Sequence, residues 1–205
     1  MNRLAVPPND FLDSMMWSIG ASAVLLGIAA IKLLPQSSTD SLAENGKGLR
    51  GGLSIALAAN GVYLFLSGMM FNYLWPLRET AGGSYDVLFG GSSALAGLVL
   101  LATAAALWYN QGLKGISYFA TVIGIFLIVD AISILNYGLT RDPQFSAILF
   151  LAPAITSFLS IPATHSDNKV FRWIFAIAAF LFALAWIFMA AETTHGHLEP
   201  PPPSS

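Results

Sequence analysis

Residues 72–91 read NYLWPLRETAGGSYDVLFGG, and the rest of the chain is arranged around them. This stretch concentrates aromatic residues, a proline, glycine pairs and opposite charges between two long apolar segments. A hydrocarbon layer about 30 Å thick requires roughly 20 mostly apolar residues in a helix, and windows of this kind recur along the chain. The stretch is therefore interpreted as a connection between two membrane-spanning helices.

The composition supports this interpretation for the whole chain. Hydrophobic residues make up 56% and charged residues only 10% of the sequence, whereas soluble domains carry about 25% charged residues. We expect an all-α, multi-pass protein of the cell membrane, whose first partner is the lipid bilayer. The net charge of -2 and the lack of a basic stripe argue against a nucleic-acid partner. The absence of cysteine excludes disulfides, Fe–S clusters and thiolate metal sites.

Apolar windows and helix-breaking residues predict six transmembrane helices in a single bundle. A polar segment, 1–12, precedes this domain of residues 13–191, and a disordered tail, 192–205, follows it. Pro153 interrupts the fifth helix and would kink it unless a neighbour satisfies the carbonyl that proline leaves free. The predicted helices span about 13–34, 51–74, 86–108, 114–135, 144–161 and 170–191.

The basic residues indicate how the six spans are oriented. Those on the side of the first, third and fifth loops outnumber Arg3, Arg78 and Arg141 on the other side. Because lysine and arginine are enriched on the cytoplasmic side, this bias predicts that both termini lie outside. The larger group comprises Lys32, Lys47, Arg50, Lys114, Lys169 and Arg172.

Asp130 is the one unambiguous charge inside a predicted span. It precedes Asn136 by six residues, which places it about 9 Å below the outer boundary. An ionised carboxylate at that depth costs several kcal/mol unless it is paired, hydrated or protonated. Two interpretations remain: Asp130 serves a solute pathway, a proton step or a gate, or it pairs with Arg78 or Arg141 at the outer interface.

Amides and aromatic residues near the same boundary are further pore candidates. Asn72-Tyr73 recurs 64 residues later as Asn136-Tyr137, and an arginine, Arg78 or Arg141, follows each pair within six residues. This echo favours two parallel repeats, or it arises by chance. Asparagines can line a pore for a polar solute or hydrogen-bond neighbouring helices. The pore candidates are Asp130, Asn60, Asn72, Trp75, Tyr85, Phe89, Asn136, Arg78 and Arg141.

Glycines spaced seven apart place small residues on one face of each of the first three helices. They predict that these three helices pack tightly together. The aromatic residues of the sixth helix, including Trp173, Phe180 and Trp186, are expected to face lipid or a neighbouring subunit. The glycine pairs are Gly20 and Gly27, Gly61 and Gly68, and Gly90 and Gly97.

The three histidines favour neither a haem nor an enzyme. His165, His195 and His197 lie in predicted loops or the tail, so no span offers paired axial haem ligands. His195 and His197, with Glu192, are weak candidates for a metal site, the alternative being a solvated tail. Because nucleophile, zincin and nucleotide-binding motifs are absent, we expect no cofactor and no enzymatic activity.

The segments Trp75-Pro76-Leu77, residues 83–90 (GSYDVLFG) and residues 135–143 (LNYGLTRDP) resemble an uncharacterised prokaryotic family of multi-pass membrane proteins. That family is defined only as a domain of unknown function. The resemblance therefore implies a membrane protein and no particular activity.

Shorter matches resemble the family of urea and short-chain amide channels. They are residues 51–55 (GGLSI) with Asn60, Leu88-Phe89-Gly90, and Gly112-Leu113-Lys114. The resemblance implies six spans, both termini outside, a pore walled by aromatic and aliphatic side chains, and ring-shaped assembly. The chain departs from that family in lacking a histidine-rich second loop, which supports acid gating there, and a tryptophan-rich fifth helix.

Two functions are consistent with the sequence. The first is a channel or facilitator for a small uncharged polar solute such as urea, a short amide or ammonia, present as a homo-oligomer. The second is a non-catalytic structural or accessory subunit of a larger membrane complex. A narrow apolar pore with a few polar groups can replace hydration without tight binding, and conduction requires this property.

Overall fold

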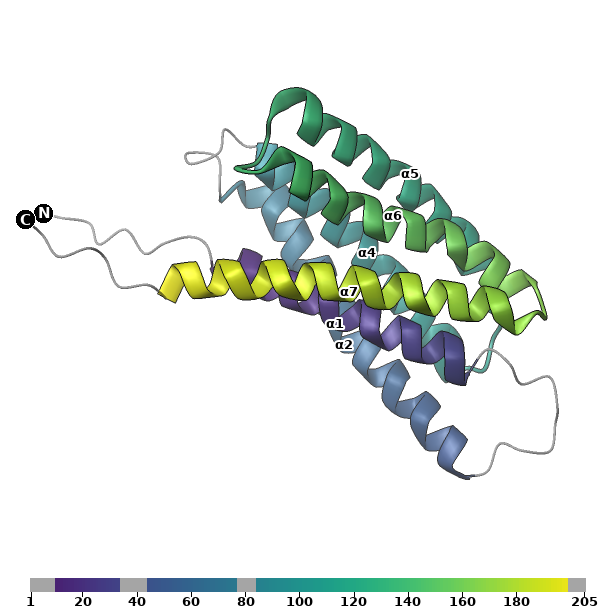
Figure 1. The fold of residues 1–205 in the computed structure, drawn as a ribbon. Helices are drawn as coiled ribbons and strands as arrows, with labels where there is room; N and C mark the ends of the chain where they lie inside the picture. The colour runs from purple at the N-terminus through teal and green to yellow at the C-terminus, as the bar shows by residue number, and fades with distance from the viewer. Residues whose placement is uncertain (1–9, 34–43, 77–83, 199–205) are drawn as a thin grey trace, which may run out of the picture.

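The computed structural model describes residues 10–33, 44–76 and 84–198, which form an all-α bundle (Figure 1). Each of the six helices in these ranges is long and apolar enough to cross a membrane, which confirms the predicted number and class of elements. Labelled as in Figure 1, they are α1 (Asp10–Lys32), α2 (Glu44–Leu74), α4 (Ser84–Trp108), α5 (Lys114–Tyr137), α6 (Pro143–His165) and α7 (Lys169–Leu198).

Several helices run beyond the apolar windows that predicted them. α2 begins at Glu44, ahead of the predicted residue 51, and α6 continues to His165. The prediction of a disordered tail from residue 192 is wrong for residues 192–198, because α7 continues to Leu198. Residues 199–205 lie outside the described ranges. Hydropathy marks only the apolar part of a helix, whereas backbone hydrogen bonding continues into the polar residues that flank it.

The helices associate as three closely packed pairs, α1 with α7, α2 with α4, and α5 with α6. Figure 1 shows α1 beside α7, and α5 beside α6. At one end of the bundle, here called the basic end, α1, α4 and α6 finish while α2, α5 and α7 begin. This end carries Lys32, Lys47, Arg50, Lys114, Lys169 and Arg172.

Glycine allows the backbones of α2 and α4 to touch. A Cβ atom placed on Gly68 would lie 2.4 Å from the backbone nitrogen of Ala94, and one on Gly97 would lie 2.5 Å from that of Phe65. Such distances leave no room for any side chain. The pair is therefore held by backbone-to-backbone packing, in which small residues permit close approach.

The first helix packs differently from the prediction. A Cβ atom on Gly20 would lie 2.6 Å from Cγ1 of Ile187, and one on Gly27 would lie 2.9 Å from Cε1 of Phe180. The small face of α1 therefore receives large side chains of α7, not the second and third helices. Spacing identified the small face, but it carries no information about which helix covers it.

A side chain of α7 also explains how α6 accommodates Pro153. Proline has no N–H, so the carbonyl of Leu149 one turn earlier loses its helical partner. The indole Nε1–H of Trp186 donates to this carbonyl at 2.8 Å, and α6 continues as a helix through the proline. Trp186 is only 4% exposed, so the prediction that it faces lipid or a neighbouring subunit is wrong. Trp173, by contrast, is 51% exposed.

Removing this donor should destabilise the bundle in a way that Pro153 controls. Trp186→Phe leaves the Leu149 carbonyl without its indole donor, and we expect a loss of about 1–3 kcal/mol in unfolding free energy. Pro153→Ala supplies a backbone N–H to the same carbonyl, so the loss should be smaller in the Pro153→Ala background. Unfolding in detergent is followed by circular dichroism for the wild type, the two single variants and the double variant. The four unfolding free energies give the coupling energy between Trp186 and Pro153.

Trp173→Phe serves as the control, because it makes the same substitution at an exposed position of the same helix. It should change stability by no more than about 0.5 kcal/mol. Equal losses for Trp186→Phe with and without Pro153 would contradict the assigned role of the hydrogen bond.

The α2/α4 contact makes a second prediction. Gly68→Ala forces the two backbones apart and should lower the unfolding free energy by about 1–3 kcal/mol. Gly51→Ala is the matched control, because a Cβ atom at that position of the same helix would have no packing neighbour within 4 Å beyond its own turn of helix. It should be neutral or slightly stabilising. The same unfolding measurement decides, and similar effects of both variants would contradict the assigned packing.

Candidate functional site

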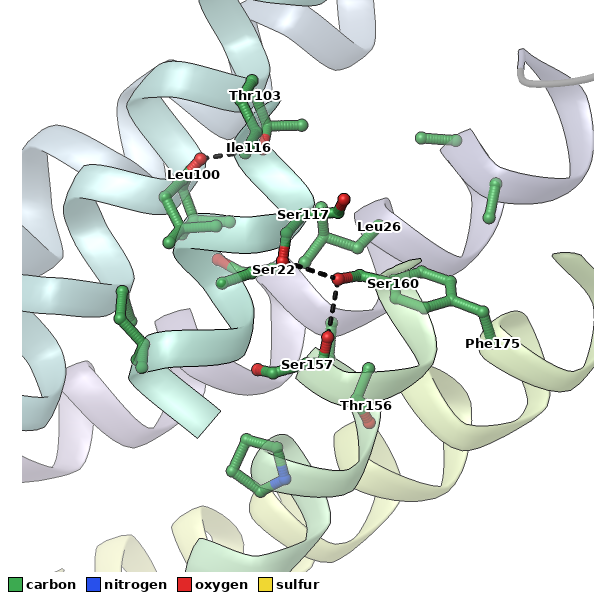
Figure 2. Close-up of a pocket in the computed structure, with 18 of the residues that line it drawn as sticks. Ser22, Leu26, Leu100, Thr103, Ile116, Ser117, Thr156, Ser157, Ser160 and Phe175 are labelled. Atoms are coloured by element: carbon green, nitrogen blue, oxygen red, sulfur yellow. Dashed lines mark hydrogen bonds between the residues drawn. The ribbon is translucent and has the colours of Figure 1, made fainter. Parts of the chain in front are cut away.

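A cavity of about 160 Å³ lies where the helix pairs meet (Figure 2). Residues of α1, α4, α5, α6 and α7 form most of its wall, and Leu64 of α2 contributes from the side. A cavity of about 150 Å³ is large enough to bind benzene. The space can therefore hold a small organic molecule.

The cavity occupies the basic half of the bundle. Its lining begins near the middle of the helices, at Ile19, Leu127 and Pro153. It continues to Leu107 in the last turn of α4 and to Leu113 immediately before α5. The cavity thus extends along the helix axes as far as the basic end.

Seven of the lining residues are serines or threonines, in a wall that is otherwise apolar. Most of their hydroxyl groups donate to backbone carbonyls, as Ser160 does to Ser157 at 2.6 Å and Thr164 does to Ser160 at 2.8 Å. Figure 2 shows Ser160 between Ser157 and the carbonyl of Ser117, which lies 3.4 Å from its hydroxyl. A hydroxyl whose proton is engaged presents only its lone pairs. The corresponding bonds of the other residues are those of Ser22, Thr103, Ser117 and Thr156.

Ser157 differs from these residues, because the described residues supply no hydrogen-bond partner for its hydroxyl. The polar groups that line the cavity are therefore mostly hydrogen-bond acceptors. One hydroxyl group, that of Ser157, has a proton available for donation. Such a lining suits a molecule that brings its own N–H or O–H donors.

Phe89, Phe150 and Trp186 pack together beyond the mid-helix end of the cavity, do not themselves line it, and are here called the aromatic layer. The ring centroids of Phe89 and Phe150 are 5.8 Å apart, and those of Phe150 and Trp186 are 6.0 Å apart. Trp186 also contacts Phe182, which lines the cavity, at 6.5 Å between ring centroids. Phe150 and Trp186 are 2% and 4% exposed, whereas Phe89 is partly exposed.

Asp130 lies beyond the cavity, on the same face of α5. Ile123 and Leu127 line the cavity, and Asp130 follows Leu127 by one turn towards the end opposite the basic one. It is 9% exposed, and its Oδ2 atom is buried without a hydrogen-bond partner among the described residues. Its neighbours on this face, Leu127, Ala131 and Ile134, belong to the same apolar cluster as Phe150 and Trp186. The carboxyl group thus sits in apolar surroundings next to the aromatic layer.

The structure does not show the alternative pairing of Asp130 with an arginine. Arg141 is exposed and forms no ion pair with Asp130, while Arg78 lies outside the described residues. Two further carboxyl groups, Asp13 and Asp86, are buried near the same end, at 8% and 0% exposure, and each has an interaction partner. The sequence did not identify these two as buried, because each stands near the start of a helix.

Asn60 has a structural role, apart from the cavity. Its Oδ1 accepts a hydrogen bond from the Ser18 hydroxyl at 2.7 Å, and its Nδ2 donates to the carbonyl of Ala56 at 3.2 Å. It therefore joins α2 to α1 and does not line the cavity.

The remaining predicted residues gather at the end opposite the basic one. Asn72 packs against Gly90, and its carbonyl accepts a hydrogen bond from the exposed Trp75 indole at 2.7 Å. Tyr85 stacks on Phe89 at 5.7 Å between ring centroids, and its hydroxyl interacts with the Arg141 backbone. Asn136 is exposed at the end of α5. Of the pore candidates, Tyr85 and Phe89 contact each other, and Phe89 belongs to the aromatic layer.

The histidines form no metal site within the described residues. No group of three histidine, cysteine, aspartate or glutamate side chains gathers there. His195 is exposed near the end of α7, and the side chain of His197 lies outside the description. His165 contacts Tyr118 edge to face, with ring centroids 5.0 Å apart.

Sequence reasoning missed the hydroxyl groups of the cavity. A signal was present in α6, where Thr156, Ser157, Ser160 and Thr164 recur at helical spacing on one face. The same residues are also common at helix contacts in membranes, so spacing alone does not separate a cavity wall from a packed interface.

Comparison with known proteins gives a family and no activity. No curated protein and no solved structure matches the chain, so the resemblance to urea and amide channels has no support beyond its short motifs. Residues 9–200 match the family described as "Protein of unknown function (DUF981)". This match covers all six helices, and the chain belongs to that family.

Proposed function

We propose that this chain is an integral membrane protein that lets small uncharged solutes rich in hydrogen-bond donors, such as urea, a short amide or ammonia, cross the bilayer. The observation that carries the proposal is the cavity between the helix pairs, with its apolar wall and its row of hydroxyl acceptors. The six long apolar helices support the membrane location.

The basic end supports the orientation. Because lysine and arginine favour the cytoplasmic side, the basic end faces the inside in this proposal and both chain termini lie outside. The cavity reaches the basic end near Leu107 and Leu113. It then serves as an inner vestibule, from which a solute moves towards the aromatic layer.

The lining favours neutral donors over ions. A bare ion loses its hydration in an apolar cavity, and this loss costs many kcal/mol without a compensating charge. A molecule with N–H groups can exchange hydrogen bonds with water for hydrogen bonds to the hydroxyl oxygens of Ser22, Ser160 and Thr164. These contacts are few and neutral, so the solute can leave again, as conduction requires.

The aromatic layer acts as the gate in this proposal, and Asp130 is the next polar group beyond it. Phe89 is the part of the layer best placed to move, because it is partly exposed whereas Phe150 and Trp186 are buried. When the Phe89 ring moves aside, the vestibule gains access to the level of Asp130. The carboxyl oxygens then accept hydrogen bonds from the passing solute.

Solute flux into proteoliposomes tests this pathway. Phe89→Ala removes a ring from the gate and should raise urea or acetamide flux about tenfold, equivalent to about 1.4 kcal/mol of barrier. Ala96→Leu fills the cavity wall and should reduce flux towards that of empty liposomes. Asp130→Asn retains a hydrogen-bond acceptor and should preserve most of the flux, whereas Asp130→Leu should abolish it. Light scattering reports urea and acetamide, and an internal pH dye reports ammonia.

Phe188→Ala is the matched control, because it removes the same ring from a position of α7 that is 53% exposed. Its flux should equal that of the wild type. Background flux of all three solutes through the wild type and Phe89→Ala alike would contradict the proposal. A stoichiometric unrelated protein that copurifies in mild detergent would then favour the role of an accessory subunit.

A further inference from the structure

Arg172 is nearly buried and lies on α7 one turn from the cavity wall, without lining the cavity itself. It is 9% exposed and precedes Phe175, a lining residue, by one turn on α7. It continues the buried face of this helix, which includes Ala176, Ala179 and Trp186. Along α7, Arg172 therefore lies between the cavity wall and the basic end.

The hydrogen bonds of this guanidinium group are incomplete. One Nη2–H donates to the backbone carbonyl of Asp167 at 3.0 Å. The Nε atom is buried and has no hydrogen-bond partner among the described residues. None of the carboxyl groups in the described ranges forms an ion pair with Arg172. The cations Lys32 and Lys169 at the same end of the bundle are exposed.

A buried cation with no counter-charge among the described residues is costly, so this arrangement favours the binding of an anion. Arginine presents its donors in a planar fork that matches the oxygens of a carboxylate or a phosphate. Next to it, the wall formed by Phe175, Ala163 and Ala30 is apolar and leads into the cavity. The site therefore combines a charged side chain with an adjoining apolar cavity.

We propose that Arg172 binds the carboxylate or phosphate headgroup of a single-chain anionic amphiphile, whose apolar chain enters the cavity. This inference rests on the same cavity as the proposed function, because the bound chain would fill the vestibule and stop solute passage. The cavity volume of about 160 Å³ accommodates part of a short chain, with the remainder covering the mouth.

Binding of octanoate to the full chain in phosphatidylcholine nanodiscs tests the proposal without any flux measurement. Octanoate should bind at least tenfold more tightly than octanol, which has the same chain without the charge. Arg172→Gln should remove this preference and leave octanol binding unchanged. Arg172→Lys keeps the charge but loses the fork, and it should retain part of the preference. Lys169→Gln, an exposed cation three residues away, is the control and should bind octanoate as the wild type does.

Further probes separate the headgroup from the chain. Octyl phosphate in place of octanoate reports which anionic head is preferred, and acetate and inorganic phosphate report the head alone. Ala96→Leu should weaken octanoate and octanol equally, because it fills the cavity. Equal affinities for octanoate and octanol in the wild type would overturn the proposal, as would binding of inorganic phosphate as tight as that of octyl phosphate. Thermal unfolding confirms that each variant is folded. If Arg172→Gln does not fold, the comparison of Arg172→Lys with the wild type tests the proposal.

Because binding is measured directly, the outcome is independent of solute flux. If the protein binds octanoate but conducts no solute, the proposed function is contradicted and this inference is supported. If the protein conducts solute but does not bind octanoate, and octanoate does not inhibit the flux, this inference fails and the proposed function stands.

Discussion

The hydrogen bond from the Trp186 indole to the Leu149 carbonyl allows α6 to carry a proline at its centre. In a hydrocarbon environment no water is available to satisfy that carbonyl, so the donor must come from a neighbouring helix. Trp186 supplies it, and in doing so fixes α7 against α6 and places its ring in the aromatic layer. The proline ring itself lines the cavity. One interaction thus preserves the helix, joins α6 to α7 beside the cavity and holds Pro153 in its wall.

Close packing within each helix pair leaves the centre of the bundle less filled. Gly68 and Gly97 bring the backbones of α2 and α4 into contact, and Gly124 does the same for α5 against α6, where a Cβ atom would lie 3.2 Å from the carbonyl oxygen of Ala154. Glycine contacts within a pair draw its helices together but exert no such pull between pairs. The cavity lies along this boundary and is lined by small residues such as Ala120.

The sequence predicted the number of helices and most of their extent, because hydropathy reports how long an apolar segment is. It did not predict which way Trp186 points or which helix covers Gly20 and Gly27. In a soluble protein the polar face of a helix identifies the buried one. In a membrane helix both faces are apolar, so Trp186 inside and Trp173 outside look alike. Only the folded arrangement distinguishes them.

The candidate site was predictable to the extent that charge stands out against an apolar background. Asp130 met that condition, whereas Arg172 did not, since basic residues are expected at helix ends.

The two side chains stand beyond opposite ends of the cavity, each with a buried polar atom that has no hydrogen-bond partner among the described residues. When Asp130 is ionised, their opposite charges set up a field along the cavity, and the low dielectric constant of its apolar wall strengthens that field. A dipolar solute such as an amide would enter with its carbonyl oxygen towards Arg172 and its N–H groups towards Asp130. An anionic amphiphile would be held at the Arg172 end and repelled from the other. In the proposed pathway, the same pair of charges would therefore separate a solute that passes from a ligand that blocks.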